Sequence, residues 1–249
     1  MTLMFRALYT LMLLTILLSC AAEQPMPAVE VEPVLKASAP AYTLNSSEYK
    51  LLLNPEKFSD YEQGFKDYWE IIKEVAVAEG IEVQSNENPT KLKRKDVTFF
   101  DTEDHKLRKN GFILRKRVKY KGDNPKPGYE YVLKYVQPDP ESAMSMDLSI
   151  GEGKYHEEKA GTELESDIVY NASAPGGTKT IFTQSNKLVA TEELSMNCDS
   201  IISIFPVLAT LNIASDVEFM PVGGGSALEW KVSPGKLGFG DNLYGEVDI

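Results

Sequence analysis

The chain has 249 residues, 43% of them hydrophobic and 25% charged, an ordinary composition for a globular protein of one large domain or two small ones. The net charge of −11 argues against nucleic acid as the main partner, because proteins that bind nucleic acid are normally basic. The positive charge is nevertheless concentrated, since residues 91–121 hold twelve of the 26 Lys and Arg. This concentration predicts a positive site on an acidic protein.

The first residues predict export and a lipid anchor. Arg6 is followed by an apolar run, residues 7–18, which is too short to span a membrane and is typical of a secretory signal. Leu17-Leu18-Ser19-Cys20 resembles the bacterial lipobox, which implies lipidation of Cys20; an ordinary signal peptide with a chance cysteine is the alternative. We therefore interpret residues 1–19 as a lipoprotein signal peptide. The expected location is a bacterial membrane, on its periplasmic or cell-surface face.

The next segment predicts a tether in front of a single folded domain. Residues 20–43 are rich in Ala, Pro, Glu and Val without periodicity, which is typical of a disordered linker. We place the folded domain at residues 44–249. If Cys20 carries lipid, Cys198 is the one remaining cysteine, so no internal disulfide can form.

The N-terminal part of the domain predicts a short strand and a long helix. The strand covers residues 48–53 and ends at Asn54-Pro55. The helix covers residues 59–79, where Ser59 and Glu62 fit a capping box and Gly80 supplies the stop. Its apolar stripe has helical spacing and comprises Tyr61, Phe65, Tyr68, Trp69, Ile72, Val75 and Ala76.

The middle of the chain predicts two-faced strands at residues 96–100, 112–120 and 129–136. In the strand 112–120, alternation places Arg115, Arg117 and Lys119 on one face and mostly apolar side chains on the other, with Lys116 as the exception. Like charges on one face repel unless an anion lies against them, although such a face is also commonly solvated. Asp101 and Thr102 are expected to cap the corner between the first two strands.

The C-terminal half is less regular. Residues 155–159 predict a strand of uncertain register, with Glu157 and Lys159 on one face. Residues 165–195 predict one or two strands around a turn at 175–177, and residues 199–212 predict a helix disturbed by Pro206. Residues 223–225 are expected to form a turn, and residues 227–233 and 244–249 to finish the fold as strands.

Several of these strands carry charged pairs on one face, and the pairs are Glu48 with Lys50, Arg115 with Arg117, Glu130 with Lys134, Glu157 with Lys159, and Glu246 with Asp248. This pattern predicts an α+β fold, an antiparallel β-barrel or tunnel with flanking helices, whose lumen holds the charges. Enclosed cations need an anion, and a polyphosphate suits arginine. The neighbouring carboxylates suit Mg²⁺ or Mn²⁺ bridging to phosphate.

Residues 97–117 contain a strand ending in Phe100-Asp101-Thr102, a Leu107-containing turn and then Leu114-Arg-Lys-Arg117. This run resembles the CYTH domain of the triphosphate tunnel metalloenzymes, and Tyr131–Lys134 resembles the following strand of the family. The resemblance implies an eight-stranded tunnel that binds a triphosphate with a divalent cation. It implies phosphate-binding roles for Lys50, Arg115, Arg117, Lys134 and Lys159, and metal-binding roles for Glu48, Glu157, Glu246 and Asp248.

The implied activity is metal-dependent hydrolysis of an inorganic or organic triphosphate or of polyphosphate. Inorganic substrates are expected before ATP, because nucleotides are scarce outside the cell. The chain departs from the family at Ser46-Ser47-Glu48-Tyr49-Lys50, where the family motif E-x-E-x-K has a glutamate at the first position. Lys231 is the candidate for a later family arginine. A catalytically degenerate lipoprotein that binds a polyanion without turnover is therefore the alternative, and a lipocalin-like barrel with an apolar ligand is a third interpretation.

Overall fold

The alternating middle of the chain forms one long curled sheet in the computed structural model, which describes residues 42–151, 153 and 161–249. Its path runs through β1 (Ser46–Lys50), β7 (Gly161–Tyr170), β8 (Thr178–Ala190), β6 (Tyr129–Gln137), β4 (Phe112–Lys121), β3 (Lys93–Asp101) and β10 (Ala227–Lys231). Two short strands, β5 (Asn124–Pro125) and β9 (Met220–Pro221), pair with β4 and β3. Every neighbouring pair is antiparallel except β1 with β7, which is parallel.

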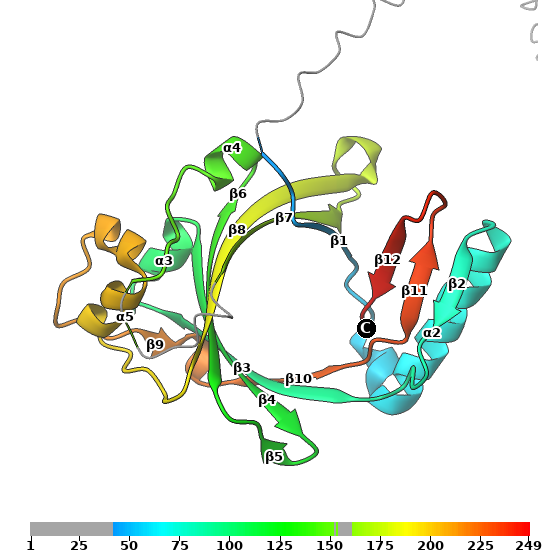
Figure 1. The fold of residues 1–249 in the computed structure, drawn as a ribbon, viewed down its shortest axis with the longest axis horizontal. Helices are drawn as coiled ribbons and strands as arrows, with labels where there is room; N and C mark the ends of the chain where they lie inside the picture. Colours follow the sequence, from blue (N-terminus) through cyan, green and yellow to red (C-terminus); the bar gives the residue numbers. More distant parts are fainter. Residues whose placement is uncertain (1–41, 152, 154–160) are drawn as a thin grey trace, which may run out of the picture. The chain divides into compact units, whose positions relative to one another are not determined.

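A second, three-stranded sheet has the order β12 (Tyr244–Val247), β11 (Gly235–Gly238) and β2 (Glu82–Ser85). Two backbone hydrogen bonds between Val232 and Ile249, of 2.9 and 3.0 Å, tie the chain after β10 to the end of β12. Figure 1 shows the large sheet curling from β1 round to β10, with the small sheet beside the open side of the curl.

The α+β class and the mainly antiparallel sheet are confirmed, but the prediction of a closed barrel is wrong: the large sheet is a half-barrel. Closure requires hydrogen bonding between the first and last strands of a single sheet. In the described residues, β1 pairs with β7 alone and belongs to the large sheet, whereas β12 pairs with β11 and belongs to the small one. The five residues of β1 are all exposed.

The hydrophobic core lies on the convex face of the large sheet. Leu114, Tyr131, Leu133 and Leu188 project from three neighbouring strands into it and are fully buried. The core also includes residues of three short helical segments, α3 (Lys106–Lys109), α5 (Cys198–Ile204) and η4 (Pro206–Leu211). A further turn, α4 (Pro140–Ala143), contacts β6 and β8. The face of β4 that was predicted to be apolar is therefore confirmed.

Lys116, the exception on that apolar face, has two partners. Its ammonium group forms an ion pair with Glu193 and lies 5.7 Å from the ring centroid of Phe100. The charge is therefore compensated at the edge of the core, and the alternation of β4 is preserved.

The long helix is confirmed as α2 (Tyr61–Ala78), with Phe65, Trp69 and Ala76 buried as predicted. Two details differ from the prediction. A preceding turn, η1 (Pro55–Phe58), shifts the start of α2, so Asp60 caps it in place of Ser59 and accepts a 3.1 Å hydrogen bond from the Gln63 amide. Val75 is 57% exposed, because the described contacts of α2 lie along its Trp69 side.

The helix α2 packs against the small sheet and β10. Tyr61 stacks on Trp230 of β10 with ring centroids 5.1 Å apart. A Cβ atom on Gly235 of β11 would lie 3.0 Å from the Trp69 ring and 2.2 Å from the Gln84 carbonyl oxygen. Glycine at this position therefore permits the close approach of α2, β2 and β11.

The remaining elements largely follow the prediction. The helix at 199–212 is broken at Pro206 into α5 and η4, and turns occur at η3 (Pro175–Gly177) and η5 (Val222–Gly224). The strands β2 and β11 were not predicted. Residues 155–159, including Glu157 and Lys159, and the N-terminal segment with Cys20 lie outside the described residues. None of the helices in the described part of the chain has both the length and the apolar character needed to cross a bilayer.

Candidate functional site

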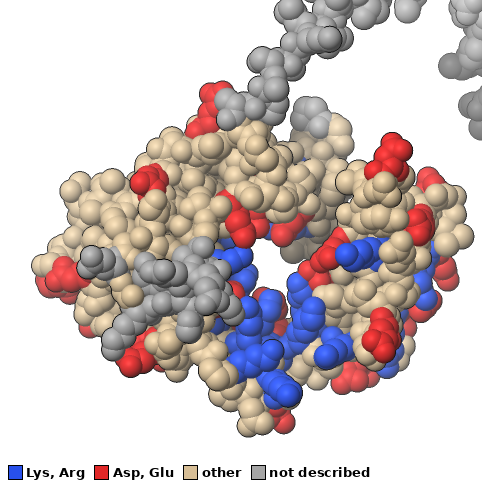
Figure 2. Space-filling model, viewed as in Figure 1, with Lys and Arg blue, Asp and Glu red and all other residues tan. Residues whose placement is uncertain are grey.

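The concave face of the large sheet is covered with charged side chains. Residues paired directly across neighbouring strands share a face, so the register follows this face from strand to strand. One row of directly paired residues on this face comprises Lys187, Val132, Arg115 and Phe99. The next row on the same face comprises Glu130, Arg117 and Val97. Figure 2 shows the result, a central hollow surrounded by Lys, Arg, Asp and Glu side chains.

The charges on this face come from seven strands. Its cations include Lys50, Lys93, Lys95, Arg115, Arg117, Lys119, Lys134, Lys187 and Lys231. Its carboxylates include Glu48, Glu130, Glu163, Glu165, Asp167 and Glu229. The structure therefore brings four of the predicted phosphate-binding residues, Lys50, Arg115, Arg117 and Lys134, to one face. The fifth, Lys159, lies outside the described residues.

Most of the cations are held by carboxylates of other strands of the sheet. Lys134 lies 2.9 Å from Glu165, Lys187 lies 2.8 Å from Glu163, and Lys95 lies 2.7 Å from Glu229. These pairs are partly buried, so screening by water is incomplete. The lining is therefore a layer of alternating charges in which each lysine is already engaged.

Glu130 holds two cations at once. It lies 2.9 Å from Arg117 and 2.8 Å from Lys119. Burial alone would raise the pKa of Glu130, but the hydrogen bonds from Lys119 and Arg117 lower it below the ordinary value. The carboxylate therefore stays ionised and fixes both cations on the concave face.

Arg115 differs from its neighbours. Within the described residues, no hydrogen bond or ion pair joins its guanidinium to an acceptor, whereas Arg117, whose Nε is likewise buried without a partner, is paired with Glu130. The register explains this, because the residues paired with Arg115 are Val132 and Phe99, which offer no acceptor. Burial, followed by the charge of Arg117, lowers the pKa of Arg115 to about 10. The charges of Glu130, Glu229 and Glu165 act in the opposite direction, so at neutral pH the site holds a partly desolvated positive charge that no direct ion pair in the described residues engages.

The sequence prediction missed part of the lining. Glu163, Glu165 and Asp167 of β7 lie on the concave face. The alternation Glu-Leu-Glu-Ser-Asp could have identified them, but the predicted strand started at residue 165. Lys93 and Lys95 were missed because β3 begins three residues before the predicted strand.

The described candidate metal ligands are each engaged by a different lysine. Glu48 lies 3.0 Å from Lys50, and Glu246 lies 3.0 Å from Lys236. Asp248 pairs with Lys231 and accepts a 2.5 Å hydrogen bond from Ser233, and although burial raises its pKa, these partners lower it overall. No three Asp, Glu, His or Cys residues in the described ranges form a group that could hold a metal.

The corner before β4 is capped as predicted. The Asp101 carboxylate accepts hydrogen bonds from the amides of Leu107 at 2.8 Å and Arg108 at 3.0 Å. Thr102 Oγ1 accepts another from the Lys106 amide at 2.9 Å. These bonds satisfy the amides of α3, which precedes β4, so the two residues have a structural role.

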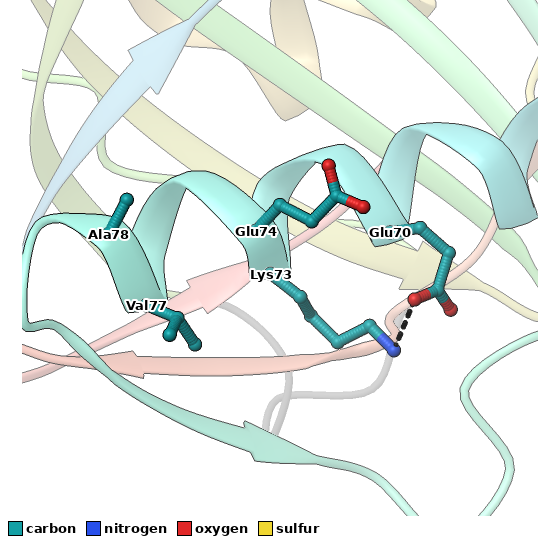
Figure 3. Close-up of a pocket in the computed structure, with 5 residues that line it drawn as sticks. All are labelled: Glu70, Lys73, Glu74, Val77 and Ala78. Atoms are coloured by element: carbon teal, nitrogen blue, oxygen red, sulfur yellow. Dashed lines mark ion pairs between the residues drawn. The ribbon is translucent and has the colours of Figure 1, made fainter.

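A shallow depression of about 440 Å³ lies elsewhere, on the outer side of α2 (Figure 3). Its residues, Glu70, Lys73, Glu74, Val77 and Ala78, all come from this one helix. The ion pair drawn in it, 2.7 Å between Lys73 and Glu70, joins residues one turn apart. A binding site normally gathers polar groups from several elements, so the concave face is the better candidate.

Fold and site together define a half-barrel protein with a charged concave face. Comparisons of the chain with protein-family models, with curated proteins and with solved structures find no match. The lining itself and the resemblance of residues 97–117 are therefore the two indications of function.

Proposed function

We propose that the concave face binds a triphosphate or polyphosphate and hydrolyses it with the help of Mg²⁺ or Mn²⁺. We further propose that the protein is exported and anchored by lipid at Cys20. The observation that carries the site proposal is Arg115, whose partly buried guanidinium has no hydrogen bond or ion pair in the described residues and lies on the same face as Lys50, Arg117 and Lys134. Such a charge is costly to keep unless a ligand compensates it.

A dense anion fits this lining better than a single carboxylate does. Arg115 and Arg117 are two residues apart on β4, so their Cα atoms are about 6.6–6.8 Å apart along the strand, and each guanidinium can hold a different phosphate. Lysines that move toward the phosphate would separate from their carboxylates, for example Lys134 from Glu165 and Lys119 from Glu130. A divalent cation would neutralise charge between these carboxylates and the phosphates, and would orient the attacking water.

Within this proposal the arginines have two tasks. They bind the phosphoryl oxygens, and they stabilise the negative charge that develops when water attacks the terminal phosphorus. Arg115 is the better candidate for the second task, because its charge is not committed to a carboxylate in the described structure. Glu130 keeps Arg117 in position through their 2.9 Å ion pair.

The alternative of binding without turnover has a specific observation in its favour. Glu48, Glu246 and Asp248 are each paired with a lysine, and Ser46 replaces the first glutamate of the family motif. Each of these carboxylates has to separate from its lysine before it can bind a metal. The lipocalin-like interpretation requires an apolar lumen and outward-pointing arginines, so the concave position of Arg115 and Arg117 argues against it.

The test is phosphate release from inorganic triphosphate with Mg²⁺ or Mn²⁺, compared between wild type, Arg115→Ala and Arg108→Ala. Arg108 is an exposed arginine on α3, outside the concave face, and serves as the control. We expect release by wild type and by the control, and a loss of about 10²–10³-fold in Arg115→Ala, the usual effect of removing one transition-state contact. Triphosphate binding without release would support the alternative. Absence of both binding and release would contradict both proposals.

A further inference from the structure

Strand β1 has a free edge in the part of the chain that the structure describes. It pairs with β7 alone, and all five of its residues are exposed. Alternate backbone groups of a strand point to opposite sides, so about half of the amides and carbonyls of β1 point away from β7, where no described strand pairs with them. An edge of this kind is a template for pairing with a further strand.

The apolar side chains at this edge lie in solvent. Tyr49 is on the face of β1 opposite Glu48 and Lys50, and its side chain is 79% exposed. Leu51 and Leu52, which follow β1 directly, are exposed as well. Single exposed apolar residues are common on protein surfaces, but a contiguous group beside an open strand edge is typical of an interaction site.

The small sheet presents a second free edge. Within the described ranges, β12 pairs with β11 on one side and with no strand on the other. Figure 1 shows β12 at the side of the small sheet that is nearer to β1. Leu243 and Tyr244, at the start of β12, are also exposed. The free edges of β1 and β12 therefore border the open side of the half-barrel.

The charge of the hollow restricts the strand that can lie along these edges. An added strand directs alternate side chains into the hollow and the others to the convex face, where Tyr49 lies. The side chains directed inward meet an excess of positive charge, because cations outnumber carboxylates among the described residues on the concave face of the large sheet (Figure 2). The complementary strand has Asp or Glu at alternate positions and apolar residues between them.

Strand β7 already shows this pattern on the paired side of β1. It places Glu163, Glu165 and Asp167 on the concave face, and Leu164 and Ile168 on the other. The Asp167 carboxylate lies 2.6 Å from the Lys50 ammonium group. An acidic strand beside β1 is thus compatible with the side chains of β1.

We propose that the free edges of β1 and β12 bind an extended peptide segment of a partner protein, in which apolar residues alternate with Asp or Glu. The segment adds as a β-strand, so backbone hydrogen bonds supply affinity and the side chains on its two faces supply specificity. Tyr49 and Leu51 contact its apolar residues, and the lysines of the concave face select its carboxylates. Because the ligand is a protein segment, this is a further function beyond phosphate hydrolysis.

The test is fluorescence anisotropy of a labelled synthetic peptide with the β7 sequence, residues 161–170, titrated with the whole chain. We expect saturable binding to wild type. The same peptide with N-methyl groups at alternate residues should bind at least about tenfold more weakly, because it cannot donate its backbone hydrogen bonds. A peptide carrying Glu163→Lys, Glu165→Lys and Asp167→Lys should be weakened similarly, because its charges then repel those of the hollow.

Variants of the chain locate the bound peptide. Tyr49→Ser combined with Leu51→Ser should weaken binding about tenfold, the combined effect of two cross-strand contacts. The control is Leu228→Ser, at an exposed leucine of β10 that is paired with Asp96 and lies outside the concave face, and it should stay within about twofold of wild type.

Four results would overturn the inference. Equal binding of the N-methylated peptide would show attachment without strand pairing. Equal binding by the Tyr49 and Leu51 double variant would place the peptide elsewhere. A dimer in light scattering that the double variant abolishes, with no peptide bound, would assign the edge to a second copy of the chain. Absence of peptide binding and of a dimer would show that the edges take no strand, while phosphate release from triphosphate would still test the proposed function separately.

Discussion

Replacing Arg115 by methionine is expected to make the protein more stable while removing its anion binding. The charged form of Arg115 is disfavoured in the folded state, since its pKa falls from 12.5 to about 10. At 1.36 kcal/mol per pKa unit this displacement corresponds to about 3 kcal/mol. Partial solvent exposure reduces the effect, so we expect Arg115→Met to raise the free energy of unfolding by about 1–2 kcal/mol.

The neighbouring arginine provides a matched control with the opposite sign. Arg117→Met removes one of the two cations that hold the partly buried Glu130 carboxylate. We expect this variant to lose about 1–3 kcal/mol, because the buried carboxylate is left with one partner. The two substitutions are identical in chemistry and lie two residues apart, so the difference in sign depends on the ion pairing alone.

The assay is urea unfolding of both variants and wild type at neutral pH, together with thermal unfolding with and without triphosphate. Each kcal/mol should move the midpoint temperature by about 2–4 °C for a domain of this size. Triphosphate should raise the midpoint of wild type and leave that of Arg115→Met unchanged. A loss of more than about 1 kcal/mol in Arg115→Met would show that the guanidinium is satisfied in the folded state, and the reasoning would be refuted.

Three other predictions concern the framework of the site. Glu130 and Glu229 have folded-state pKa values below the ordinary 4.5, so their contribution to stability is present above about pH 4.5 and is lost as the pH falls through the folded-state values. The variant Glu130→Gln should therefore flatten the pH profile of urea unfolding in this acidic range. Asp101→Ala should cost about 1–3 kcal/mol in the same assay, because two amides before β4 lose their acceptor; an unchanged midpoint would show that water replaces it. Trp69→Ala should cost about 3–5 kcal/mol, since the ring is buried against β11, and a cost below 1 kcal/mol would contradict that packing.

The sequence predicted the lining well where the information is local. Alternation along β4 and β6 placed Arg115, Arg117 and Lys134 on one face, because the apolar side chains between them have to enter the core. The corner at Asp101 was predicted for the same reason, since its hydrogen-bond partners lie within seven residues.

The parts that failed depend on contacts between distant segments. Closure of the barrel requires β1 and β12 to pair, and neither strand carries a pattern that specifies its neighbour. The parallel pairing of β1 with β7 brings Glu48 opposite Asp167, a relation across more than a hundred residues. Exposure of Val75 likewise reflects how α2 packs on the small sheet, not the spacing of its apolar residues.

The structure of the chain with triphosphate and Mn²⁺ bound, solved by crystallography, tests the central claim most directly. We expect phosphate density on the concave face, within hydrogen-bonding distance of the Arg115 guanidinium and flanked by Arg117 and Lys134. Triphosphate bound elsewhere at full occupancy, with Arg115 extended into bulk water, would contradict the account.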